Sequence, residues 1–416
     1  MNRIRKVYYT QESLTMPCRS CGAGALEPVF SLGSLPLSNA LVDEAGLSIS
    51  DELHPLDLDC CVSCGMLGIR QAVAPERLFR EYLYYSSYSA TAVEHAHAFA
   101  QNAIAELGLG PKSLVIEVAS NDGYLLSHFH ARGIATLGIE PARNVADVAR
   151  SKGVQTVTEF FDKDLAPSLP KADLVIANNV LAHVPDPNGF VSGLGTIVRP
   201  GGTITVEVPS LLELVDNTEF DTVYHEHFSY FSATSLDALF ARNGLAVERV
   251  DLLVLHGGSL RFTLRKGSGG ERPRNLAELL SREAAWGVRD PLVYRMLAHK
   301  VSGMKVALSG FLQDAIVHGR SVAGYGAPAK ATVFLNHFGL GPDKIPFVVD
   351  RNPHKQGRYI PGVRIPIRSV DLLRLEKPDF VLVLPWNLAN EIIEQEQDLL
   401  RQGSRFVVAI PSLRLI

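Results

Sequence analysis

The five cysteines of this 416-residue chain all lie between Cys18 and Cys64. Four of them form two C-x-x-C pairs, Cys18 with Cys21 and Cys61 with Cys64. Two such pairs supply the four thiolates of a closed structural zinc site, whereas the disulfides of a secreted scaffold would be spread along the chain. We therefore predict a structural Zn²⁺ on these four cysteines, with a hairpin or small excursion between the pairs. The alternative is a set of buried cysteines without metal, and Cys60 has no predicted role.

The length and the charge of the chain limit its domain count and its partners. A length of 416 residues predicts two or three domains. Lys and Arg number 40 against 44 Asp and Glu, so the net charge of −4 gives no reason to propose nucleic acid or an acidic membrane surface as a partner. No apolar run is long enough to span a membrane, and residues 1–16 lack the apolar stretch of a secretory signal. We expect a cytoplasmic protein.

The middle of the chain alternates short apolar runs with helical patterns. After a helical pattern at 91–108, strands are predicted at 113–120, 135–141, 156–160, 172–179 and 201–209. This alternation predicts a parallel sheet with helices on both faces. Two β-like runs then follow each other between residues 246 and 267 with no helix between them. We predict that they form a terminal antiparallel hairpin.

Ligands of such a sheet bind at the carboxyl ends of its strands. That edge includes the loop Glu117–Gly123 and Glu140, an acidic residue that can hold the two ribose hydroxyls of an adenosine. A dinucleotide needs a glycine-rich turn for its pyrophosphate, which the sequence EVASNDG lacks. The polar residues Ser120, Asn121 and Asp122 instead suit a ligand with amino-acid groups. We therefore favour S-adenosylmethionine (SAM) over NAD, although Asp122 could also be a plain helix cap.

A dense group of proton-transfer residues follows the fifth predicted strand. Tyr224, His225, Glu226 and His227 are consecutive, and Tyr230 follows closely. The same edge of the sheet receives a further histidine and two amides from the end of the fourth strand: His183, Asn178 and Asn179. A single histidine is usually structural, but several proton-active groups at one cofactor-binding edge indicate acid–base chemistry.

Methyl transfer to carbon would use both the cofactor and this cluster. A carbon nucleophile forms when a base removes a proton beside a carbonyl and a donor stabilises the enolate oxygen. We therefore predict SAM-dependent C-methylation through an enolate. The alternatives are O- or N-methylation of a sugar or small metabolite, a zinc-bearing protein that binds SAM or a nucleotide sugar without catalysis, and an NAD-dependent sugar reductase.

The last third of the chain predicts a second α/β unit. Helical patterns cover roughly 275–318, and residues 319–339 indicate a strand, a glycine turn and a helix. Further strands are predicted at 345–352, 377–387 and 404–412, and a helix at 390–403. The glycine turn could receive a phosphate with help from a lysine, and an aromatic at the same edge could stack on a base. The candidate residues are Gly324, Tyr325, Gly326, Lys330, Asp350, Trp386 and Asn387. The alternative is a packing turn with a solvated lysine.

These motifs together resemble the sugar C-methyltransferases that act on nucleotide-linked 4-keto-deoxysugars. The resemblance covers nearly the whole chain and rests on the paired C-x-x-C, EVASNDGYLL, GIEPARN, NNVLAHVP, TVYHEHFSYFSATS, HGGSLR and AGYGAPAKA. It implies an α/β protein with a zinc-binding N-terminal domain, a central Rossmann-like class I SAM methyltransferase domain and a second Rossmann-like C-terminal domain that helps to enclose the nucleotide sugar. We place these domains at 1–80, 81–270 and 271–416.

The resemblance also implies roles for individual residues. His227 would remove the proton next to the ketone with help from Tyr224 and Glu226, and His183 would lie near the keto oxygen. SAM would be bound by Glu117, Ser120, Asn121, Asp122, Gly123, Glu140 and Asn178. The sugar, carried on thymidine diphosphate as a dTDP-4-keto-6-deoxyhexose, would meet Tyr82, Tyr84, Asn179 and the C-terminal candidates named above. His225 has no implied role.

Overall fold

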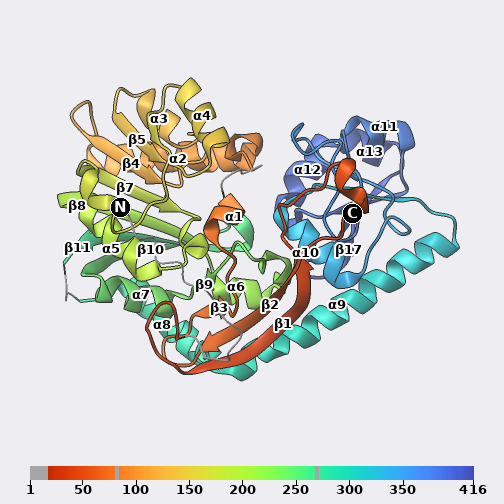
Figure 1. The fold of residues 1–416 in the computed structure, drawn as a ribbon, viewed down its shortest axis with the longest axis horizontal. Coiled ribbons are helices and arrows are strands. Elements are labelled where there is room, and N and C mark those ends of the chain that lie inside the picture. The colour runs from red at the N-terminus through yellow and green to blue at the C-terminus, as the bar shows by residue number, and fades with distance from the viewer. Residues whose placement is uncertain (1–16, 80–83, 268–270) are drawn as a thin grey trace.

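The computed structural model of the chain describes residues 17–79, 84–267 and 271–416. These residues form three sheets with their covering helices (Figure 1). Tyr82, one of the predicted sugar-binding residues, lies outside the described residues. None of the helices in the three described ranges is long and apolar enough to cross a membrane.

The N-terminal sheet has the strand order β1-β2-β3-β9. β1 (Leu26–Pro36) and β2 (Leu53–Cys61) form a long antiparallel hairpin, with a 3₁₀ turn at Ala45–Ser48 between them. This is the excursion predicted between the two cysteine pairs. β3 (Leu67–Ile69) leads to α1 (Pro75–Phe79). The fourth strand, β9 (Ser229–Tyr230), comes from the histidine-rich segment in the middle of the chain.

One long helix, α9 (Pro291–Val317), lies along β1 and reaches from the central domain to the C-terminal domain (Figure 1). Asp290 caps its start by accepting a hydrogen bond from the N–H of Leu292, and Pro291 occupies the first helical position, where no N–H is needed. Its buried residues recur every three or four positions, which gives one apolar face: Tyr294, Leu297, Val301, Met304, Leu308, Leu312 and Ala315.

The central sheet has the strand order β10-β11-β8-β7-β4-β5-β6. Its five parallel strands are β4 (Leu114–Val118), β5 (Ala135–Ile139), β6 (Thr156–Val157), β7 (Ala172–Asn178) and β8 (Val198–Pro209). β10 (Leu245–Leu253) and β11 (Ser259–Lys266) form the predicted antiparallel hairpin, and β11 also pairs antiparallel with β8. The order of parallel strands reverses between β4 and β7, which places a ligand site at their carboxyl ends.

Helices cover both faces of the central sheet. They are α2 (Ala90–Leu107), α3 (Leu126–His130), α4 (Arg143–Ser151), α5 (Pro187–Ile197), α7 (Ala233–Arg242) and α8 (Arg274–Trp286). The short helix α6 (Leu211–Asp216) instead packs in the core shared with β1, β2 and α9. Because both faces are covered, the inner strands are almost continuously apolar, and Val115, Ile116, Leu174 and Ile176 are fully buried.

The C-terminal sheet has the order β14-β13-β12-β15-β16-β17. Its strands are β12 (Val322–Tyr325), β13 (Val348–Val349), β14 (Ile367–Arg368), β15 (Phe380–Val383), β16 (Arg405–Val408) and β17 (Arg414–Leu415), of which only β17 pairs antiparallel. Its helices are α10 (Ala329–Phe338), α11 (Asp371–Glu376), α12 (Ala389–Gln395) and α13 (Gln397–Arg401).

The helix predicted at 390–403 is divided in two at Glu396. The buried carboxylate of Glu396 accepts hydrogen bonds from the Tyr325 hydroxyl at 3.3 Å and from Arg374 Nη2 at 3.0 Å. Reaching both partners places this residue at φ −110° and ψ 28°, outside the helical region, and the helix restarts after it.

Candidate active site

The four paired cysteines come together in the N-terminal domain. All four Sγ atoms lie within 4.8 Å of one another, with Cys18 to Cys64 at 3.7 Å and Cys21 to Cys61 at 3.5 Å. A tetrahedron with Zn–S bonds of about 2.3 Å has S–S distances of about 3.8 Å. The donor set and its spacing therefore fit the predicted structural zinc.

Cys60 is excluded from this group by its place on the strand. Neighbouring residues of a strand point to opposite faces, so Cys60 packs in the core beneath β1 and β2 while Cys61 faces the other thiols. Burial raises the pKa of the Cys60 thiol to about 12, so it stays protonated. The spacing argument for Cys61 is confirmed.

The turn after β4 has an unusual backbone. Ala119, Asn121 and Gly123 have φ values of 56°, 48° and 74°. Residues other than glycine cost free energy in this left-handed region and are concentrated at functional sites. The backbone of this turn therefore adopts conformations that glycine favours, although the turn lacks the G-x-G-x-x-G motif of dinucleotide-binding proteins.

Buried acceptor atoms surround this turn. Within the described part of the chain, Glu117 Oε2, Ser120 Oγ, Asp122 Oδ1 and Asn178 Oδ1 are buried and have no hydrogen-bond partner. Burial, with the nearby Asp122 and Glu140, raises the pKa of Glu117 well above its usual range. Buried acceptors of this kind are normally satisfied, so they fit a ligand that brings donors, such as the ammonium and hydroxyl groups of SAM.

Asn121 and Glu140 support the turn from within. The Glu140 carboxylate accepts hydrogen bonds from the N–H groups of Asn121 at 3.0 Å and Ala142 at 2.9 Å, and burial raises its pKa to about 7. The Asn121 amide donates to the carbonyl of Tyr84 and accepts from the N–H of Ser86, each at 3.0 Å. Asn121 thus connects the aromatic segment around Tyr84 to the turn, and Glu140 holds the turn through its backbone N–H groups.

Two imidazoles lie side by side at the carboxyl edge of the central sheet. The ring centroids of His183 and His227 are 4.7 Å apart, and the Tyr224 ring is 4.0 Å from that of His227. His183 ends a 3₁₀ turn (Leu181–His183) after β7, and His227 lies in residues 224–230, here called the catalytic segment.

The hydrogen bonds of both imidazoles define their tautomers. His183 Nδ1 lies 2.8 Å from the carbonyl of Glu226, and His227 Nδ1 lies 2.8 Å from the carbonyl of Thr222. A carbonyl only accepts, so each Nδ1 carries the proton, and in a neutral ring the lone pair is on Nε2. Burial lowers the pKa of His183 to about 4, although its bond to Glu226 opposes this, so His183 is neutral at pH 7.

The catalytic segment is also anchored to the N-terminal domain. Glu226 accepts from Asn39 Nδ2 at 2.7 and 3.0 Å, and burial raises its pKa to about 7 against the lowering effects of Asn39 and Lys355. The buried His225 bonds through Nε2 to the carbonyl of His54 at 3.0 Å, which is a structural contact.

A further charged group at this edge has no counterpart among the predicted residues. Glu207, at the end of β8, is fully buried and accepts from Arg261 Nη2 at 2.7 Å, with His95 Nε2 at 3.2 Å. Burial opposes ionisation, but His95 and Arg261 lower the pKa of Glu207 to about 2. Asn179 Nδ2 donates to the same carboxylate at 3.3 Å. In the sequence, Arg261 of the motif HGGSLR was the residue that could have indicated this charged group. Its contact with Glu207 arises because β11 pairs with β8, which the sequence pattern alone does not show.

The C-terminal candidates divide into two groups. Lys330 donates to Asn387 Oδ1 at 2.9 Å and lies over the Trp386 ring at 4.4 Å, while Trp386 Nε1 donates to the buried Asp221 of the central domain at 3.0 Å. Lys330, Trp386 and Asn387 therefore meet the central domain. Since Lys330 is half-buried and bonded, the solvated lysine of the alternative interpretation is wrong.

The other C-terminal candidates build the turn itself. A Cβ on Gly324 would lie 2.6 Å from Val348, and one on Gly326 (φ 85°) would lie 2.5 Å from Pro385, so both glycines permit close packing. The side chain of Tyr325 points into the domain core toward Glu396, which corrects its prediction as a sugar contact. Asp350 accepts from the N–H of Ala327 at 2.7 Å and shapes the turn.

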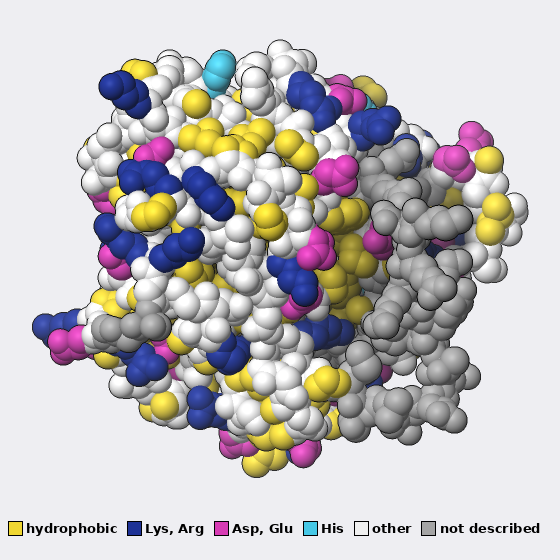
Figure 2. Space-filling view, turned by 60° about the vertical axis from the view of Figure 1, so that its left-hand side comes forward, with side chains coloured by type: hydrophobic (Ala, Val, Ile, Leu, Met, Phe, Trp, Pro, Cys, Tyr) yellow, Lys and Arg dark blue, Asp and Glu magenta, His cyan; other side chains and the backbone are white. Residues whose placement is uncertain are grey.

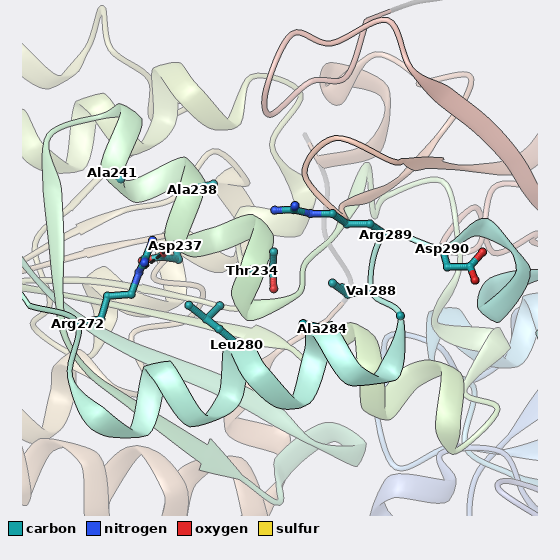
Figure 3. Close-up of a pocket in the computed structure, with 11 residues that line it drawn as sticks. Thr234, Asp237, Ala238, Ala241, Arg272, Leu280, Ala284, Val288, Arg289 and Asp290 are labelled. Atoms are coloured by element: carbon teal, nitrogen blue, oxygen red, sulfur yellow. Dashed lines mark hydrogen bonds and ion pairs between the residues drawn. The ribbon is translucent and has the colours of Figure 1, made fainter.

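A surface pocket of about 620 Å³ lies apart from these groups, between α7, α8 and the turn before α9 (Figure 3). In Figure 3 the guanidinium of Arg272 points at Asp237, to which it donates at 2.8 Å. None of the predicted site residues lines this pocket. On the face shown in Figure 2, basic and acidic side chains are scattered among exposed hydrophobic ones.

Three domain families match consecutive parts of the chain. They are described as a zinc binding domain at residues 18–79, a methyltransferase domain at 92–250 and a C-methyltransferase C-terminal domain at 254–411. C-methyltransferase NovU from Streptomyces niveus is 36% identical over 404 residues, which cover 96% of this chain and 96% of NovU. The chain belongs to the C-methyltransferase family. It is a SAM-dependent enzyme with a structural zinc site, and the predicted fold class is confirmed.

Other similarities of this C-methyltransferase are partial. A ubiquinone biosynthesis O-methyltransferase from Chromobacterium violaceum is 31% identical over 96 residues, 22% of this chain and 41% of that protein. Magnesium protoporphyrin IX methyltransferase from Synechocystis PCC 6803, solved with SAM, is 14% identical with a TM-score of 0.36, covering 47% of this chain and 99% of that one. A TM-score this low supports no conclusion about this chain.

Proposed function

We propose that this C-methyltransferase methylates a carbon beside the ketone of a nucleotide-linked keto-deoxysugar, a dTDP-4-keto-6-deoxyhexose. The observation that carries the proposal is the His183–His227 pair, whose rings lie 4.7 Å apart at the cofactor edge with Tyr224 4.0 Å from His227. Removal of an α-proton needs a neutral base and a hydrogen-bond donor for the enolate oxygen. The imidazole of His227, whose Nδ1–H is engaged by Thr222, lies next to the phenol of Tyr224, and together they supply a base and a donor.

In this proposal His227 is the base. Its Nδ1–H is engaged by the carbonyl of Thr222, so Nε2 takes the proton as the C–H electron pair becomes that of the enolate. The Tyr224 hydroxyl donates to the enolate oxygen, since a neutral His183 that donates through Nδ1 to Glu226 has no second N–H to offer. His183 lies beside the keto oxygen and orients the catalytic segment through its bond to Glu226. The side chain of Glu226, which is hydrogen-bonded to Asn39, assists His227. SAM, held by residues that include Glu117, Asp122 and Asn178, would supply an electrophilic methyl group to the enolate carbon.

The proposed SAM site lies at the carboxyl ends of β4, β5 and β7. Glu117, Ser120, Asp122 and Asn178 have the buried free acceptor atoms that suit the ammonium and hydroxyl groups of SAM. Glu140 receives the ribose, and Asn121 acts through the aromatic segment that it holds. Gly123 serves the turn itself, because a Cβ there would lie 3.2 Å from Ala149 of α4.

The proposed nucleotide-sugar site lies between the central and C-terminal domains. Lys330 supplies positive charge, and Trp386 and Asn387 line the same edge. We also assign Tyr84 and Asn179 to this site; Tyr84 is held by Asn121 and Asn179 by Glu207. Tyr82 belongs to the same stretch of sequence as Tyr84. The turn of Gly324, Gly326 and Asp350 shapes this side by packing. The N–H groups of Gly324 and Gly326 donate to the carbonyls of the neighbouring strand segment, and the N–H of Ala327 donates to Asp350, so the charged donor for a phosphate is Lys330.

The test is to incubate the purified protein with SAM and a panel of dTDP-4-keto-6-deoxyhexoses and to identify products by mass spectrometry and NMR. A new methyl group on a ring carbon next to the ketone supports the proposal. Methyl transfer to oxygen or nitrogen would replace it with the O- or N-methylation alternative. Tight binding of SAM and sugar with no turnover across the panel would favour a non-catalytic binding protein.

A further inference from the structure

The catalytic segment ends in β9, the outer strand of the zinc-bearing sheet. β9 pairs antiparallel with β3, with Gly68 opposite Ser229 and Leu67 opposite Tyr230. One residue further, the N–H of Ile69 donates to the carbonyl of Phe228 at 3.1 Å. β3 follows the second cysteine pair directly, since Leu67 is three residues after Cys64. The segment with the proposed base is thus hydrogen-bonded to the strand that directly follows the zinc knuckle, residues 18–21 and 61–64.

Phe228 joins this sheet to the neighbourhood of both histidines. It is fully buried, follows His227 directly, and donates its N–H to the carbonyl of Ala182, the residue before His183, at 2.7 Å. Its own carbonyl faces the N-terminal domain. Phe228 is therefore covalently linked to His227 and hydrogen-bonded to the residue before His183. The position of its backbone affects both histidines.

Arg19, inside the zinc knuckle, adds two hydrogen bonds to the pairing of β3 with the catalytic segment. It lies between Cys18 and Cys21, and its Nη1 donates to the carbonyl of Ile69 at 2.7 Å and to that of Phe228 at 3.3 Å. A Cβ on Gly68 would lie 3.1 Å from this Nη1 and 3.3 Å from the Phe228 oxygen, so the guanidinium crosses the strand where no side chain interferes. A charged donor on two carbonyls is stronger than a neutral hydrogen bond and defines direction as well as distance.

The knuckle that carries Arg19 is itself fixed to the central domain. Asn188 of α5 donates to the carbonyls of Arg19 at 3.0 Å and Ser20 at 2.7 Å. Arg242 of α7 donates to Ser20 O at 3.1 Å and to Ser20 Oγ at 2.8 Å. Zinc bound to Cys18 and Cys21 would fix the backbone on both sides of Arg19. The Arg19 side chain is therefore attached to a rigid part of the chain.

We propose that Arg19 is a positioning residue for methyl transfer: from the zinc knuckle it holds the Phe228 carbonyl, and through it the relative placement of His227 and His183. This extends the proposed function, because the geometry it serves is that of the proposed base. Displacement of a catalytic group by about 1 Å can cost about a hundredfold in rate, so a contact this far from the substrate can act on the chemical step.

Two arginine variants of the full zinc-loaded enzyme separate positioning from stability. Arg19→Met removes the bonds to Ile69 and Phe228. Arg242→Met is the matched control, because Arg242 braces the same knuckle without touching the catalytic segment. Arg19→Lys keeps a charged donor and should fall between Arg19→Met and the unmodified enzyme, and it serves if Arg19→Met does not fold.

The first readout needs no sugar substrate. In histidine-labelled protein with SAM bound, Arg19→Met should shift the imidazole NMR signals of His183 and His227, keep the zinc content of the unmodified protein and change the Kd for SAM less than about threefold. The second readout is turnover, where kcat should fall at least about tenfold with KM for the sugar nearly unchanged. Arg242→Met should leave both readouts near those of the unmodified enzyme.

Three results would overturn the proposal: unchanged histidine signals in Arg19→Met, equal effects in Arg242→Met, or loss of zinc or SAM binding together with the signal change. If the NMR shifts appear but no dTDP-ketosugar is turned over by any form of the enzyme, then the proposed substrate is wrong while the positioning by Arg19 stands.

Discussion

Asn39 of the N-terminal domain donates its side-chain amide to both carboxylate oxygens of Glu226, at 2.7 and 3.0 Å. The two residues are 187 positions apart in the chain. Glu226 is buried, and the hydrogen bond from Asn39 opposes the rise in pKa that burial causes. The N-terminal domain thereby controls the charge of a residue next to the proposed base.

Asn39→Ala should move the pH dependence of turnover. Removing the donor raises the pKa of Glu226 above its present value of about 7, so the carboxylate is protonated at a higher pH than before. If ionised Glu226 assists catalysis, the acidic limb of the kcat profile moves to higher pH, and the rate recovers near pH 9. A profile that keeps its position while the rate falls equally at every pH would remove Glu226 from this role.

Loss of zinc should remove activity by releasing the knuckle. Cys61→Ser deletes one of the four ligands, so zinc content should fall well below about one per chain, and the melting temperature and turnover should fall with it. Cys60→Ser is the control, because Cys60 lies in the core and faces away from the other thiols. Metal analysis of both variants decides the point: zinc loss in Cys60→Ser with retention in Cys61→Ser would contradict the assignment.

Partly buried His183 should make the protein less stable in acid. Its pKa is about 4 in the folded chain, below the value of about 6.5 in the unfolded chain, so only the unfolded state takes up a proton as the pH falls from 6.5 to 4. The free energy of unfolding therefore falls by about 3 kcal/mol as the pH falls through this range, and it does not change above the range. Urea unfolding of His183→Asn should show a shallower loss between these pH values, and parallel curves would contradict the argument.

Lys330 should matter for the nucleotide sugar and not for SAM. It is half-buried beside Trp386 and Asn387, where a diphosphate would gain a charged donor. Lys330→Met should raise KM for the sugar nucleotide about tenfold or more and leave the Kd for SAM unchanged. Lys344→Met, at a partly exposed lysine after α10, is the matched control. A similar KM in both variants would place the diphosphate elsewhere.

Much of the fold follows from local patterns. Strands β4, β5, β7 and β8 are predictable because strands covered on both faces are continuously apolar. The zinc site is predictable because its ligand spacing is local in each pair. The strands β13, β14 and β17 have two residues each, too few to show a period of two, so only β13 falls within a predicted run.

The parts of the site that depend on distant pairing could not be predicted. β9 joins β3 although Tyr230 and Leu67 are far apart in the chain, and this pairing carries the contact of Arg19 with Phe228. Glu207 meets His95 from a position 112 residues away, and neither lies in a motif of its own. The sequence places proton-active residues at one edge of a sheet, but only the packing of three domains determines which of them touch.

The central claim is that His227 removes an α-proton from the sugar. The most direct measurement is NMR of a dTDP-4-keto-6-deoxyhexose incubated in deuterated water with the enzyme or with His227→Asn, whose amide can still donate to Thr222. The unmodified enzyme should replace the hydrogen beside the ketone with deuterium, and the variant should bind SAM normally but exchange at least about a hundredfold more slowly. Exchange at an unchanged rate in His227→Asn would contradict the account.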